Sequence, residues 1–160
     1  MKSVIASLLI ATGMWAAENV NVTIPANGSP ALMLTVPATA RITKEKEKIE
    51  IKTKGMDLYI WPVASAKTVD EGVAQIPKVI EHEVVKFAAT TTNTITVDGA
   101  AAKHLMGHGV EADDYDPATA DVVVFTTGKA VFAACVHGEG NQASVEREPM
   151  LAVLKTAKAP

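Results

Sequence analysis

The sequence predicts an α+β domain with an antiparallel β-sheet and two main helices packed on it. Short segments in which apolar and polar residues alternate recur along the chain, separated by turn residues, as expected for strands joined in hairpins. Two other segments carry apolar residues at every third or fourth position, which is the period of a helix buried on one side. Consecutive hairpins with helices gathered on one face are typical of an α+β antiparallel sheet.

The first 17 residues are predicted to be a secretory signal peptide. Lys2 gives a positive start, residues 4–14 are largely apolar, and small residues follow. Cleavage is expected after Gly13 or after Ala17. The apolar run is too short to cross a bilayer, which needs about 20 apolar residues. We therefore expect an exported protein, periplasmic or extracellular, with no transmembrane segment in the mature chain.

Residues 31–160 are predicted to form a single α+β domain, preceded by a lead-in segment at residues 18–30. A chain of 160 residues fits one domain. Its formal net charge is −3, and removal of Lys2 with the signal peptide would make it −4. Charges of both signs are interspersed, without the basic stripe that binds phosphate backbones, so no nucleic-acid partner is expected.

The single cysteine excludes an internal disulfide. Cys135 lies in an apolar run, which predicts a buried, inert thiol. The alternative is a nucleophilic thiolate, because His137 lies two residues on and would share a strand face with Cys135.

The first half of the chain is predicted to hold four strands. Residues 19–24 alternate as a short edge strand, and residues 31–36 form a second apolar run. Residues 48–54 and 57–61 are the clearest strands, and Gly55 between them indicates a hairpin.

The second half is predicted to be a meander of strands around an acidic loop at residues 111–117. β-Branched residues dominate its first strand, and Asp98-Gly99 is a hairpin signal. The strands expected here are residues 87–98, 101–110, 121–127 and 130–137.

Two helices are predicted. Thr68 and Glu71 have the spacing of a capping box, so a helix is expected over residues 69–84 with a break at Pro77. The second helix is expected to begin near Pro149. Its apolar face would comprise Met150, Val153, Leu154 and Ala157.

Four local signals occur in the order found in a known superfamily. They are a Leu-Thr-Val-Pro turn at residues 34–37, Thr-Val-Asp-Glu at 68–71, Val-Asp-Gly-Ala at 97–100, and a C-terminal helix at 150–158. On these segments the chain resembles the PsbP-like superfamily, which includes an extrinsic protein of photosystem II and the Ran-binding Mog-type proteins. The resemblance implies the fold over residues 31–158. It supplies no catalytic motif, and none of the photosystem protein's functional residues is matched.

Three histidines and the acidic loop are the candidate metal ligands. His104 and His108 would share a strand face about 13 Å apart, too far for one ion unless the strand bulges. His137 lies on another predicted strand and could join either, while Asp113 and Asp116 could add carboxylates. The alternative is that these are scattered surface histidines and a solvated acidic turn. Glu81 and Glu83, which flank His82, are expected on a solvated face.

Tyr59 and Trp61 form the candidate interaction surface. They share one face of their predicted strand, and such aromatics anchor interfaces or line ligand pockets. The alternative is that Trp61 belongs to the core.

The sequence therefore favours an exported, non-catalytic binding or accessory domain that assists an envelope or membrane-associated complex. Its partner would be a protein or a small ligand, and no cofactor is expected. The alternatives are a metal-binding protein or metal-dependent enzyme that uses the His/Asp cluster, and a carrier of a small apolar ligand.

Overall fold

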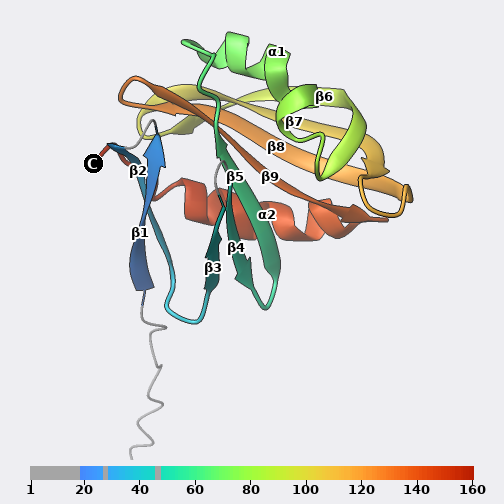
Figure 1. Ribbon diagram of the computed structural model, residues 1–160, viewed down its shortest axis with the longest axis horizontal. Coiled ribbons are helices and arrows are strands. Elements are labelled where there is room, and N and C mark those ends of the chain that lie inside the picture. The colour runs from blue at the N-terminus through green and yellow to red at the C-terminus, as the bar shows by residue number, and fades with distance from the viewer. Residues whose placement is uncertain (1–18, 27–28, 46–47) are drawn as a thin grey trace, which may run out of the picture.

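The computed structural model describes residues 19–26, 29–45 and 48–160 (Figure 1). The expected signal peptide at residues 1–17 lies outside the described residues. The elements in chain order are β1 Asn19–Ala26, β2 Ser29–Pro37, β3 Arg41–Lys44, β4 Ile49–Thr53, β5 Met56–Pro62, α1 Val69–Val79, β6 Val84–Val97, β7 Ala100–Glu111, β8 Pro117–Thr127, β9 Ala130–Glu139 and α2 Gln142–Leu154. Neither of these two helices is long and apolar enough to span a bilayer.

The strands confirm the predicted antiparallel α+β class, and the sheet is more extensive than expected. Seven strands form one sheet in the order β3-β4-β5-β9-β8-β7-β6, while β1 and β2 form a separate pair. All pairings among these strands are antiparallel. The sequence did not reveal β3, an edge strand whose one apolar residue is Ile42, because so short a segment carries no periodic signal.

The two helices cover opposite faces of the large sheet, which corrects the expectation that they gather on one face. In Figure 1, α1 lies above the sheet and α2 below it. Side chains alternate between the faces along β9: Cys135 packs in the same cluster as Ile76 of α1, whereas Val136 packs in the cluster of Met150 of α2. Because β9 is apolar at successive positions, both of its faces need a covering layer.

The β1–β2 pair closes the core on the α2 side. Val22 and Ile24 of β1 are buried in the same cluster as the apolar face of α2. Thr35 of β2 donates its N–H to Thr156 Oγ1 at 2.8 Å, which fixes the pair against the C-terminal end of α2. Val22 and Ile24, within the expected lead-in segment, thus contribute to the core of the domain.

Helix α1 begins as predicted and ends earlier. The Thr68 side chain accepts the N–H of Glu71, and the Glu71 carboxylate accepts the N–H of Lys67, so the first turn is capped from both directions. Pro77 lies inside the last turn, and the helix stops at Val79 instead of continuing to residue 84. The following turn carries Glu83 back toward the sheet.

Helix α2 begins at Gln142, seven residues before the expected start at Pro149, which lies inside the helix. A proline there removes one backbone hydrogen bond. The buried side chains Ala143, Glu146 and Met150 follow helical spacing against the sheet on both sides of Pro149. Their packing outweighs the local preference, and such a tertiary effect cannot be seen in the sequence.

Gly107 of β7 lies where β6 packs closely against β7, so a substitution there tests this packing. A Cβ at this position would overlap the backbone carbonyl of Ala88 and the ring of Phe87. Gly107→Ala should therefore destabilise the fold by about 1–3 kcal/mol, because β6 must shift. The matched control is Gly55→Ala, since a Cβ there meets nothing within 4 Å. Urea unfolding of both variants measures the difference, and equal midpoints would contradict this packing.

Candidate functional site

A pocket of about 360 Å³ opens where β5, the β7–β8 loop and the end of β9 meet the start of α2. It is lined by Asp57, Tyr59, Glu111, Asp113, Asp114, His137, Gly138, Glu139 and Gln142. We call these nine residues the acidic pocket. Gly138 has a φ of 156°, and a Cβ there would overlap the Gln142 side chain, so this glycine allows α2 to start beside the pocket.

The lining is strongly acidic. Five of the nine residues are carboxylates, and none of these nine is lysine or arginine. Asp57 Oδ2 lies 2.5 Å from Lys52 Nζ, but Asp57 Oδ1 is buried and makes no hydrogen bond within the described part of the chain. Carboxylates gathered in a concave surface create a negative potential that favours a cation.

His137 is held between two carboxylates. Its Nδ1 lies 3.1 Å and 3.2 Å from the two carboxylate oxygens of Glu111. Its Nε2 lies 3.5 Å from Glu83 Oε2, which is within ion-pair range but does not meet hydrogen-bond geometry. The Tyr59 ring stacks on the imidazole at a centroid distance of 5.2 Å. The His137 side chain is only 10 % exposed, so these neighbours determine its charge.

The backbone holds Glu83 and Glu111 in place. Ala112 N–H donates to the Glu83 carbonyl at 3.0 Å, which ties the turn after α1 to the end of β7. Lys48 Nζ also pairs with Glu83 Oε1 at 2.5 Å. Glu83 therefore has two cationic neighbours when His137 is protonated.

The electrostatics follow from this arrangement. Burial lowers the pKa of His137, but Glu83 and Glu111 outweigh it and hold this pKa above the ordinary 6.5. Burial raises the pKa of Glu83, and contact with His137 and Lys48 more than reverses that effect. Burial together with nearby carboxylates raises the pKa of Tyr59, so its hydroxyl stays neutral.

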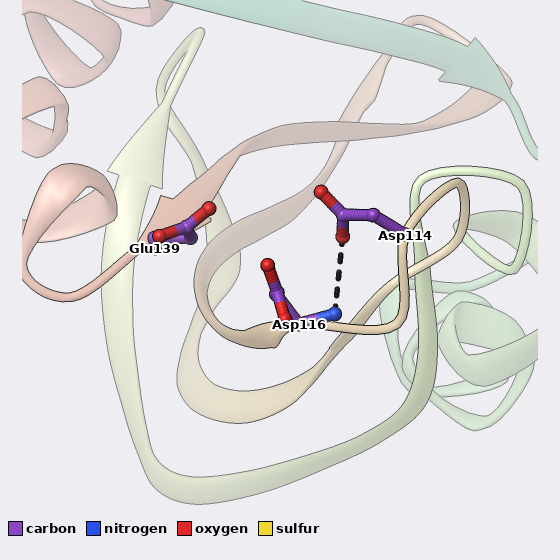
Figure 2. A group of neighbouring side chains, drawn as sticks. All are labelled: Asp114, Asp116 and Glu139. Atoms are coloured by element: carbon purple, nitrogen blue, oxygen red, sulfur yellow. Dashed lines mark hydrogen bonds between the residues drawn. The ribbon is translucent and has the colours of Figure 1, made fainter.

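The outer rim of the pocket is a group of three exposed carboxylates (Figure 2). Their oxygens, from Asp114, Asp116 and Glu139, lie within 4.8 Å of one another. Asp114 Oδ1 accepts the N–H of Asp116 at 3.0 Å, which shapes the loop.

His104 belongs to a different cluster, on the α2 side of the sheet. Its Nε2 lies 2.7 Å from Asp121 Oδ1, and Arg147 of α2 binds both oxygens of Asp121 at 2.8 Å and 3.1 Å. Burial raises the pKa of Asp121, but His104 and Arg147 outweigh it and lower this pKa below the ordinary 3.8. His104 is 4 % exposed and Asp121 2 % exposed. The cluster joins β7, β8 and α2, and its His104 and Asp121 side chains are buried while Arg147 is partly exposed.

The five candidate metal ligands do not converge. His104 and His137 lie on opposite faces of the sheet. Neighbouring residues along a strand point to opposite faces, and the pairing of β7, β8 and β9 puts the two histidines on different sides. His108 is exposed on β7 on the His104 side. Only Asp113 joins His137 in the lining of the acidic pocket, while Asp116 lies on its rim.

The two aromatic candidates divide between pocket and core. Tyr59 lines the acidic pocket. Trp61 stacks on Tyr59 at 6.0 Å but is 8 % exposed and packs in the α1-side core. Cys135 is fully buried, and burial raises the pKa of its thiol well above the usual value, so it is no reachable nucleophile.

The sequence analysis missed four of the nine pocket residues and the role of Glu83. Glu83, expected on a solvated face, has a side chain only 12 % exposed and pairs with His137. Asp57, Gly138, Glu139 and Gln142 gave no motif, whereas Glu111, Asp113 and Asp114 belong to the predicted acidic loop. One signal was available. His137 lies two residues after Cys135 and so faces the same buried side of β9, and a buried histidine requires a polar partner.

No protein-family model matches the sequence, and no curated protein is detectably similar to it. Solved structures do match. Cyanobacterial PsbP (CyanoP) from Synechocystis sp. PCC 6803 superimposes with a TM-score of 0.60 at 9 % identity, covering 92 % of this chain and 96 % of that chain. The chain has the PsbP-like fold. LpqN of Mycobacterium tuberculosis superimposes with a TM-score of 0.50 at 15 % identity, covering 89 % of this chain and 90 % of LpqN. The predicted resemblance is confirmed at the level of the fold.

The Asp121 cluster predicts a large loss of stability on mutation. Asp121→Ala leaves Arg147 and the buried His104 without their carboxylate, and should cost about 3–5 kcal/mol. Asp113→Ala, on the exposed loop, is the control and should change stability by less than about 0.5 kcal/mol. Chemical denaturation compares the two, and a loss below about 1 kcal/mol for Asp121→Ala would refute the structural role.

The His137 cluster predicts a pH-dependent contribution to stability. Because folding raises the pKa of His137, its stabilisation is fully present below pH 6.5 and is lost as the pH rises through the folded value. The stability difference between wild type and His137→Gln should therefore be larger at pH 6 than at pH 9. The slope should be at most about 1.4 kcal/mol per pH unit. A difference that does not change with pH contradicts this assignment.

Proposed function

We propose that the chain is an exported, non-catalytic accessory domain that binds a cationic group of a protein partner in the acidic pocket. The observation that carries this proposal is the lining, in which five of nine residues are carboxylates and none is lysine or arginine. A negative pocket of this kind selects lysine or arginine side chains and steers their approach.

The size and chemistry of the pocket suit such a group. About 360 Å³ falls in the lower part of the range for ligand pockets, roughly 300–1,000 Å³, and leaves room for one long side chain. A guanidinium group presents a planar fork of donors that matches carboxylate oxygens. Asp113, Asp114 and Glu139 are exposed and supply carboxylate oxygens that such a fork can reach.

Export and an accessory role have independent support. The first 17 residues have the pattern of a secretory signal peptide. LpqN, which shares the fold, is described as involved in cell envelope biogenesis. A non-catalytic role is favoured because Cys135 and His104 are both enclosed in the protein.

A divalent metal ion and an apolar ligand are weaker alternatives. The three rim carboxylates are all exposed, and no histidine joins them. Ca²⁺ prefers six to eight oxygen ligands, so three carboxylates that each offer one oxygen would leave at least three positions to water. The predominantly acidic lining does not suit an apolar ligand.

The test compares two tripeptides with blocked ends by isothermal titration calorimetry. One contains three arginines, and the other contains three citrullines, which keep the shape of arginine without its charge. We expect the arginine peptide to bind at least tenfold more tightly, and to weaken as NaCl rises from 50 to 300 mM because salt screens the attraction.

Substitution of the lining locates the binding. The double variant Asp113→Asn/Glu139→Gln should weaken the arginine peptide about three- to tenfold, since each exposed pair contributes modestly. The control is Asp70→Asn, an exposed carboxylate on α1 outside the pocket. Equal affinity for both peptides would refute the proposal, and tight, stoichiometric Ca²⁺ or Zn²⁺ binding without peptide binding would establish the metal alternative.

A further inference from the structure

The acidic pocket contains a group that can itself carry a positive charge. Protonated His137 lies between the carboxylates of Glu83 and Glu111, and its ring forms part of the pocket lining beside Glu111. A ligand cation in the pocket would therefore lie next to a positive charge held by the same carboxylates. Two like charges in a partly buried site repel each other strongly.

We propose that a cation entering the acidic pocket displaces one proton from His137, so that ligand binding and deprotonation of this imidazole are coupled. The inference rests on the proposed function, because it concerns the same pocket and the same class of ligand.

The hydrogen-bond pattern identifies the proton that leaves. Nδ1 faces both oxygens of Glu111 at 3.1–3.2 Å and can keep its proton in the neutral ring. Nε2 makes no hydrogen bond, although it lies 3.5 Å from Glu83. The Nε2 proton is therefore the one released. Because Nε2 is buried, the proton reaches bulk water only when the side chains around the ring move. The neutral ring still donates from Nδ1 to Glu111, and the ligand cation replaces the lost charge.

The other groups around His137 are one cation, two neutral side chains and several carboxylates. Glu83 keeps Lys48 as a partner when His137 becomes neutral. Tyr59 on β5 stays uncharged, and Cys135 on β9 stays a thiol, because burial raises the pKa of each. The remaining charged groups of the pocket are carboxylates, which attract the ligand and the proton alike: Asp57 of β5, Glu111 of β7, Asp113 and Asp114 of the loop, and Glu139 of β9.

Linkage gives the consequence for affinity. Where free His137 is protonated and bound His137 is neutral, affinity should rise up to about tenfold per pH unit. It should level off above the pKa of His137 in the free protein, where no proton remains to be displaced. A partner would thus be held more weakly in an acidic compartment than in a neutral one.

The test measures the proton directly. The blocked triarginine peptide is titrated into the full chain at pH 6.5 in two buffers of different ionisation enthalpy. The difference in observed heat gives the number of protons released. Wild-type protein should release a substantial fraction of one proton, and His137→Gln should release none. His82→Gln is the control, since it removes an exposed imidazole outside the pocket and should release as many protons as wild type.

A second measurement covers the case in which His137→Gln does not fold. In the wild-type protein, the imidazole proton signal of His137 is followed by NMR from pH 5 to 9, with and without the peptide. Its titration midpoint should move to lower pH when the peptide is bound.

The outcomes separate the two proposals. Peptide binding without proton release, or without a shift of the His137 midpoint, overturns the inference and leaves the proposed function intact. Absence of any preference for arginine over citrulline overturns both.

Discussion

Burial of β9 on both faces is the constraint from which the rest of this structure follows. All six residues from Val131 to Val136 are at most 2 % exposed. A strand that is apolar at successive positions needs a covering layer on each side, and α1 and α2 supply these layers. Because side chains alternate along β9, each residue is assigned to one core or the other. The face to which each residue of β9 points also decides which polar groups lie close together where the apolar run ends.

The acidic pocket lies at that end. His137 directly follows the buried run and keeps the inward phase of Cys135, so its ring is largely enclosed. An enclosed imidazole requires hydrogen-bonding or charged partners. Glu83 provides one from the turn after α1, and Glu111 provides the other from the end of β7. Asp113, Asp114 and Glu139 of the same pocket are exposed, and their charges are the basis of the proposal that a cation binds there.

Two histidines of the same sheet therefore have different roles. His104 is closed in by Asp121 and Arg147, so its contacts stabilise the packing of α2. His137 has a carboxylate on each side and an open pocket next to it. The similarity to CyanoP at 9 % identity shows that two chains with few residues in common have the same fold. Function must consequently be argued from the pocket, because one fold can carry many sites.

The sequence by itself determined the elements that have a local signal. Alternation fixed β4 and β5, the Asp98-Gly99 turn fixed the β6–β7 hairpin, and the spacing of Thr68 and Glu71 fixed the start of α1. The resemblance to PsbP-like proteins added the overall fold. Only the tertiary structure decided that the helices cover opposite faces, that α2 runs through Pro149, and that His137 meets Glu83 and Glu111 while His104 meets Asp121. The physical reason is that local patterns indicate the backbone conformation and which side of each strand or helix is buried. The partners of a buried polar group instead come from distant segments, and strand order and register bring them together.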